Sequence, residues 1–181
     1  MGIHLVSNKL VPAGKVVKLK LGIRRGNYND SSQGWTDGYA TKASTGSIYL
    51  NVEYSVTEGV YAGRKIFSQI GLNSPKGPWW RRRGRLLILS ILNSAHGFSP
   101  NDLSKKALTA RRLKSFKDID GIEFSARIKV VKNQKGQLQN DIDEPIVPDT
   151  SDTHFAQPRL KQKDVTSKLT QVAAGPIWMQ R

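Results

Sequence analysis

The stretch SIYLNVEYSVTEGVYAGRKIFSQIGL, residues 47–72, decides the fold because apolar and polar side chains alternate along it. In its first half every second side chain is apolar, a period typical of a half-buried strand: Ile48, Leu50, Val52, Tyr54 and Val56. Glu58 and Gly59 supply a turn, and a second strand is predicted over residues 61–72. The short connection predicts an antiparallel hairpin.

Further strands are predicted on both sides of this hairpin. Residues 15–24 alternate cleanly, with apolar positions that include Leu19 and Leu21 on one face and basic side chains on the other. Residues 122–130 repeat this pattern, and residues 116–120 are predicted to form a short strand just before them. Together these segments predict five strands.

Two helices are expected between the third and fourth strands. Apolar side chains from Leu87 to Ala95 recur at helical spacing, and Gly97 can end that helix. Ser99 is a suitable N-cap for a second helix that runs to about Leu113. Residues 26–46 show neither period and are rich in Gly, Asn and Ser, so a long functional loop is predicted there.

This order predicts a mainly β fold with a helical insert, of the α+β class. Specifically, we expect a five-stranded OB-like barrel with one or two helices between strands three and four. Other small α+β folds share the same order of elements. The predicted domain spans residues 1–135, and residues 136–181, rich in Gln, Asp and Pro, are predicted to form an extended or flexible tail.

The charge of the chain points to a polyanionic partner. The 181 residues include 29 Lys and Arg against 14 Asp and Glu, a net charge of +15. Residues 1–132 hold 23 basic and 8 acidic side chains, whereas residues 133–181 hold 6 of each, so the predicted domain carries the whole surplus. A surplus of this size creates a positive surface field, for which polyphosphate is the usual partner.

Nothing in the sequence favours an enzyme. With no cysteine, thiolate catalysis and Cys-ligated metals are excluded, and the three histidines lie in separate segments. No phosphate-binding loop, zinc-protease motif or nucleophile elbow is present, and we expect no cofactor and no metal. Acidic residues between Asp141 and Asp149 could suggest a nuclease metal site, but a solvated loop is the favoured interpretation.

No apolar run is long enough to span a bilayer, so we expect a cytoplasmic protein without membrane contact.

Cations next to aromatic side chains form the candidate site, because single-stranded DNA offers phosphates and unpaired base faces. The first group lies in the 26–46 segment and its flank: Arg24, Arg25, Tyr28, Trp35 and Tyr39. For Trp35, burial at the end of the barrel is the open alternative. The second group is the run Trp79, Trp80, Arg81, Arg82, Arg83 and Arg85, in which one tryptophan is expected to pack beneath the helix.

The third group lies on the outer face of the predicted sheet: Lys18, Lys20, Arg24, Lys65, Arg127 and Lys129, with the aromatics Tyr49 and Phe67. The two aromatic side chains are candidate stacking platforms on adjacent strands. Alternatively, both lie beneath a helix and form a second small core.

Four stretches together resemble a bacteriophage and prophage family of single-stranded-DNA-binding proteins: residues 46–72, VPAGKVVKLKL (11–21), ILNSAHGFSPNDLS (91–104) and DIDGIEFSARIKV (118–130). The resemblance implies an OB-like fold and a role in phage DNA replication or recombination inside the bacterial host cell. Proteins of this type often end in an acidic tip, whereas this chain ends in an apolar and basic one. Ile177 and Trp178 are therefore expected either to recruit a different protein partner or to dock on the protein's own surface.

The leading hypothesis is thus sequence-tolerant binding of single-stranded DNA without catalysis. Single-stranded RNA and a homo-oligomer stay open, since stacking does not sense the 2′-hydroxyl. The alternative is a phage structural or assembly protein whose basic face contacts nucleic acid or another subunit. A nuclease or recombination enzyme ranks third.

Overall fold

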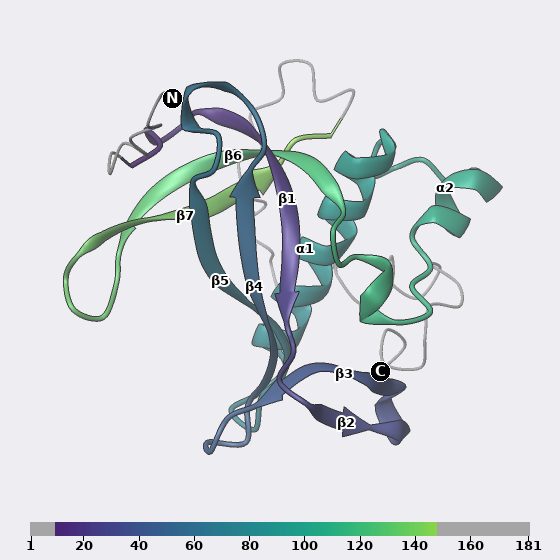
Figure 1. The fold of residues 1–181 in the computed structure, drawn as a ribbon. Coiled ribbons are helices and arrows are strands. Elements are labelled where there is room, and N and C mark those ends of the chain that lie inside the picture. The colour runs from purple at the N-terminus through teal and green to yellow at the C-terminus, as the bar shows by residue number, and fades with distance from the viewer. Residues whose placement is uncertain (1–9, 148–181) are drawn as a thin grey trace, which may run out of the picture.

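The structure, a computed structural model, describes residues 10–147 and is built mainly from strands (Figure 1). The strands are β1 (Val16–Arg24), β2 (Tyr28–Asp30), β3 (Trp35–Lys42), β4 (Ile48–Val56), β5 (Lys65–Asn73), β6 (Glu123–Lys132) and β7 (Leu138–Pro145). The helices are α1 (Trp79–His96) and the short α2 (Lys105–Ala110), with 3-10 turns η1 (Ser31–Gln33), η2 (Gly59–Tyr61) and η3 (Phe116–Asp118).

The strands form one curled antiparallel sheet with β4 and β1 at its centre. β4 pairs along its length with β5, which confirms the predicted hairpin, and along the opposite edge with β1 and the end of β3. β1 also pairs with β6, and β6 pairs with β7. Curling brings the edge strands β5 and β7 together, where Ser68 Oγ donates to Asp141 Oδ1 at 3.2 Å. This architecture, with one main helix, is consistent with an OB-like α+β fold.

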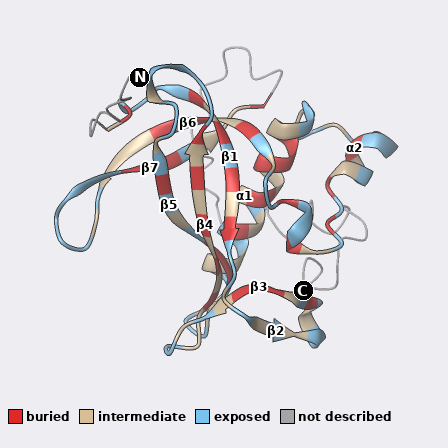
Figure 2. Cartoon of the chain, in the orientation of Figure 1, coloured by how far each residue is buried: buried red, intermediate tan, exposed pale blue. Residues whose placement is uncertain are grey.

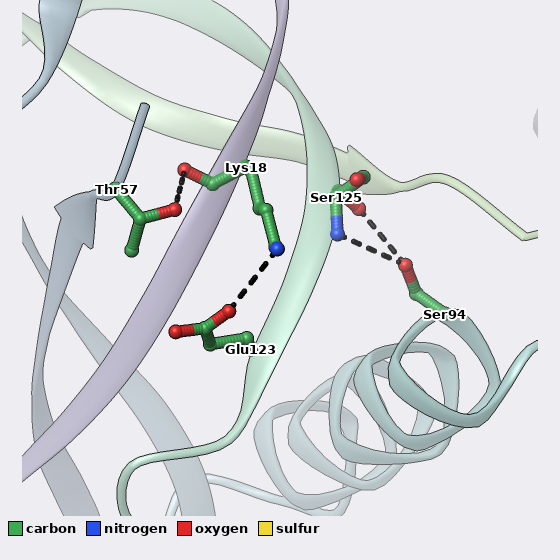
Figure 3. A network of polar contacts seen from close by, with 5 residues as sticks. All are labelled: Lys18, Thr57, Ser94, Glu123 and Ser125. Atoms are coloured by element: carbon green, nitrogen blue, oxygen red, sulfur yellow. Dashed lines mark hydrogen bonds and ion pairs between the residues drawn. The ribbon is translucent and has the colours of Figure 1, made fainter. Parts of the chain in front are cut away.

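The core lies between the concave face of the sheet and α1, as the buried segments in Figure 2 show. The predicted inward positions of β1 and β4 are all buried, because alternation places them on one face. Close contact between α1 and β5 depends on two glycines: a Cβ on Gly84 would collide with the backbone of Gly71, and a Cβ on Gly71 would collide with the Trp80 ring. At the other end of α1, Ser94 Oγ donates to Ser125 O of β6 and accepts from Ser125 N (Figure 3).

The prediction that residues 26–46 form an irregular loop is wrong. β2 and β3 make a short antiparallel hairpin there, with Gly34 at φ 74° after η1. Polar side chains close this hairpin: Gly38 N donates to Asn29 Oδ1, and Phe116 N donates to Asp37 Oδ2 at 2.7 Å. The first hydrogen bond lies within the hairpin and the second ties the hairpin to η3, so polar contacts hold strands that have no apolar alternation of their own.

Three more predictions near the end of the domain are corrected. Residues 116–118 form η3 rather than a strand, because Ser115 and Asp118 make a capping box. The second helix begins only after Ser104, whose hydroxyl accepts from Ala107 N, so α2 is shorter than predicted. β7 lies beyond residue 135, so the sheet includes part of the segment that was predicted to be a tail. The predicted partner residues Ile177 and Trp178 lie outside the described residues.

Candidate nucleic-acid interface

The outer face of β4 and β5 carries an exposed phenylalanine surrounded by charge. Phe67, opposite Glu53 in the β4–β5 register, is 52% exposed, and the Arg24 guanidinium lies 4.8 Å from its ring centre. Arg24 and Lys65 share the Glu53 carboxylate at 3.0 and 2.6 Å. Hydrogen bonds first from Lys65 and then from Arg24 lower the pKa of Glu53. Two cations on one carboxylate leave a positive charge beside the ring.

Three other cations of the outer face are each paired with an acid. Lys18 Nζ lies 3.2 Å from Glu123 Oε2, a pair seen in Figure 3. Arg127 pairs with Glu144 at 3.3 Å, and Lys129 pairs with Asp141 at 3.7 Å. Lys20 forms no ion pair within residues 10–147. Because paired charges largely cancel at a distance, the β1–β6–β7 side is a weaker phosphate surface than its count of lysines and arginines suggests.

The two tryptophans at the start of α1 have different environments. Trp80 is partly buried and packs on Gly71 of β5, as one tryptophan of the pair was expected to do. Trp79 is 67% exposed, and the Arg83 guanidinium lies 5.4 Å from its ring centre. Trp79 thus repeats the arrangement of Phe67, an exposed ring with a guanidinium above it.

The first turns of α1 carry several arginines at the N-terminal end of the helix, where the helix dipole makes positive charge unfavourable. The N-cap is Pro78, which makes no side-chain cap, and the first turn holds no acid. Arg81, Arg82 and Arg83 follow, and none of them forms an ion pair with another described residue. Burial and then the charge of Arg81 lower the pKa of Arg85 to about 10. Since the helix dipole is positive at this end, an anion would be stabilised here by the arginines and by free backbone N–H groups together.

A cleft of about 520 Å³ connects the two exposed rings. It lies between β5, the start of α1 and β7, and its walls include Phe67, Trp79 and Arg83. Tyr54, Trp80 and Asp141 also line the cleft. The cleft therefore joins a stacking surface of the sheet to the arginine-rich end of the helix.

The aromatic side chains of the 26–46 segment do not form a free stacking surface. Trp35 is 2% exposed and packs against Phe116, with ring centres 6.5 Å apart, so it belongs to the core. Tyr39 is also buried, and its hydroxyl donates to Asp120 Oδ2 at 3.1 Å while Arg25 covers the ring at 4.7 Å. Tyr28 is partly buried, with Lys42 Nζ 5.2 Å from its ring centre. The expected role of Trp35 and Tyr39 as base clamps is thus contradicted by their burial.

Tyr49 is partly exposed on the outer side of β4, opposite Gly71 of β5. Tyr49 therefore lies beside β5, but it does not line the cleft. Sequence reasoning missed Gln69, Gln139 and Asp141 as cleft residues. The alternation of residues 65–69 signals that Gln69 shares a face with Phe67, but nothing local signals that β7 lies beside β5.

No group of three acidic, His or Cys side chains within residues 10–147 could hold a metal ion. Asp141 and Glu144 instead form the ion pairs with β6, and Asp149 lies outside the described residues. Over the same residues, no helix has both the length and the apolar character needed to cross a membrane.

Comparison with family models, with curated proteins and with solved structures finds no match to this chain.

Proposed function

We propose that the protein binds single-stranded DNA without strong sequence preference and without catalysis, on the face formed by β4, β5 and the start of α1. The observation that carries the proposal is the pair of exposed rings, Phe67 and Trp79, each with a guanidinium above it and both on one cleft. Sequence-tolerant binders of single strands need flat side chains for the bases and cations for the phosphates. Both are present within this one surface.

The connectivity supports a finer assignment of the fold. Leaving out the β2–β3 hairpin, the strands follow the order β5-β4-β1-β6-β7, with α1 between the third and fourth strands in sequence. That is the order of a five-stranded OB barrel, in which the β2–β3 hairpin is an insertion between the first two strands. OB folds bind oligonucleotides on strands two and three, which correspond here to β4 and β5. Phe67 lies on that face.

The proposed biological setting follows from the resemblance to phage single-stranded-DNA-binding proteins. The protein would coat single strands during phage replication or recombination in the bacterial cytoplasm. A partner bound through Ile177 and Trp178, and assembly of several copies on one strand, belong to the same proposal.

The test is competitive binding to single-stranded and duplex DNA of equal length at two salt concentrations. A preference for single strands that persists at the higher salt supports stacking, whereas equal and salt-sensitive binding to both favours the structural or assembly alternative.

Phe67→Ala and Trp79→Ala should each weaken single-strand binding by about tenfold, the size of one stacked base. The matched control is Leu103→Ala, an exposed apolar residue between α1 and α2 that lies outside the cleft. Equal affinities for all three variants would contradict the proposed face.

A further inference from the structure

The edge strands β5 and β7 face each other across a gap that no backbone ladder closes. β5 pairs with β4 and β7 pairs with β6, and neither strand has a partner on its other side within the described sheet. The hydrogen bond from Ser68 to Asp141 crosses this gap, which we call the seam. Free strand edges carry unpaired N–H and C=O groups, so the seam offers hydrogen bonds to a ligand that lies in it.

The register shows which backbone groups of β5 face the seam. Val56 N donates to Arg64 O at 2.8 Å, so Val56 is a bonded position of the β4–β5 hairpin. Bonded positions recur at every second residue of an antiparallel pair, which makes Ser68 a bonded position as well. The N–H and C=O groups of Phe67 and Gln69 therefore point away from β4. Both residues are exposed, so a ligand at the seam can approach them.

The cleft continues along the seam into a second hollow of about 140 Å³. Phe67 and Gln139 line both the cleft and this hollow, so the two meet at the exposed ring. Leu138, Arg64 and Lys65 line the second hollow, and none of the described residues around it is acidic. Leu138 is 58% exposed and Gln139 is exposed beside it. One groove, the seam groove, thus runs from the start of α1 to the start of β5.

Positive charge lies at both ends of the seam groove. Arg83 lines it at the α1 end, and Lys65 lines it at the β5 end. Lys65 shares the Glu53 carboxylate with a second cation, so that group keeps a positive charge. On a path across the sheet, over β1 and β6, Lys18 and Arg127 each have an acid of their own. A chain of phosphates is therefore stabilised more along the seam groove than across the sheet.

We infer that the bound single strand lies lengthwise in the seam groove, from the start of α1 past Phe67 to Leu138. The inference rests on the proposed function and deepens it, because it adds β7 and the second hollow to the site. A base stacked on Phe67 is then followed by a phosphate at Lys65 and by a base against Leu138. The nine residues of β5 span about 30 Å, which is long enough for the smallest single-strand sites of about four nucleotides.

The test places a negative charge on each of the two possible paths. Leu138→Glu puts it in the second hollow, and Val16→Glu is the matched control, an apolar residue of β1 that is 45% exposed and lines neither hollow. Fluorescence anisotropy measures binding of labelled oligothymidines of about 3 and about 10 nucleotides, below and above the smallest single-strand sites. Leu138→Glu should weaken binding of the longer strand about tenfold, through lost apolar contact and repulsion of phosphates, and leave the shorter strand within about twofold. Val16→Glu should leave both affinities within about twofold.

A second variant separates the contact at Leu138 from its charge. Leu138→Ala adds no charge and should weaken binding of the longer strand about threefold. Thermal denaturation shows that each variant is folded. If both Leu138 variants bind the longer strand like the wild type, or if Val16→Glu weakens it as much as Leu138→Glu does, the lengthwise path is refuted while single-strand binding stands. If the wild type shows no preference for the single strand over a duplex of equal length, the proposed function fails, and the lengthwise path fails with it.

Discussion

At the scale of single residues, burial decides which aromatic side chains are available to a ligand. Four aromatic residues, Trp35, Tyr39, Phe67 and Trp79, are candidates for stacking by sequence, because each lies in a segment that carries or is flanked by cations. Trp35 and Tyr39 are buried, whereas Phe67 and Trp79 are more than half exposed. The difference lies in what each ring meets across the fold, such as Phe116 for Trp35, and that neighbour is far away in the sequence.

Trp35→Ala should therefore act on stability rather than on binding. Removing a buried tryptophan leaves a cavity and lowers the free energy of unfolding by about 3–5 kcal/mol. Thermal denaturation measures the loss, and DNA affinity is compared at a temperature where both proteins are folded. A stable variant with weakened binding would return Trp35 to the interface.

Glu53 restrains the positive charge beside Phe67, so Glu53→Gln should tighten binding to single strands. The change releases Arg24 and Lys65 to contact phosphates, and the salt dependence of the affinity should become steeper. Glu123→Gln is the matched control, because it releases only Lys18, away from the cleft. Equal gains for both variants would mean that only the net charge matters.

The same carboxylate gives a prediction on pH. The pKa of Glu53 is lower in the folded chain than its ordinary value of 4.5, so its ion pairs stabilise the fold above that value. This stabilisation is lost as the pH falls through the lowered pKa. The melting temperature of the wild type should therefore fall more steeply than that of Glu53→Gln on acidification below about pH 5. Parallel curves would show that the pairing adds nothing to stability.

At the scale of elements, the arginines at the start of α1 destabilise the helix at the end that faces the cleft. Replacing Arg81, Arg82 and Arg83 with Ala removes cations from the positive end of the helix dipole, so the melting temperature should rise or stay constant. Binding to single strands should weaken, and the slope of log affinity against log salt should decrease by up to about 2, roughly 0.7 for each lost contact. The control replaces Lys105 and Lys106 of α2, which are exposed and remote from the cleft. An unchanged slope in the arginine variant would remove the run from the interface.

The packing of α1 on β5 makes a prediction opposite to helix propensity. In an exposed helix Gly→Ala stabilises by about 1 kcal/mol. Gly84→Ala should instead destabilise the protein, because the new methyl group collides with the backbone of Gly71. Thermal denaturation tests this, and a more stable variant would show that α1 can move away from β5 without loss.

At the scale of the whole molecule, β7 belongs to the domain. Asn140 of β7 is buried, accepts from Val11 N at 2.9 Å and donates to Val11 O at 2.8 Å, which ties the last strand to the first described residues. Ile142 is buried in the core beside it. β7 also forms one wall of the cleft.

A chain ending at residue 135 should therefore lose cooperative thermal unfolding, whereas a chain ending at residue 147 should keep it. The shorter chain lacks β7 and exposes the edge of β6, with its row of unpaired backbone groups. Calorimetry on the two chains measures the difference. Cooperative unfolding of both chains would support a domain that ends at residue 135, as the composition predicts.

The sequence by itself determined the strands β1, β4, β5 and β6, the helix α1 with its end at Gly97, and the positive charge, because periodicity and composition are properties of neighbouring residues. It also placed Phe67 on an outer face and expected one of the two tryptophans to be packed. Only the tertiary structure decided that Trp35 is core, that Lys18, Arg127 and Lys129 are paired with acids, and that β7 closes a cleft against β5 and α1. Each of these depends on sheet register and on contacts between residues far apart in the chain, and no local pattern encodes which distant side chain will be the neighbour.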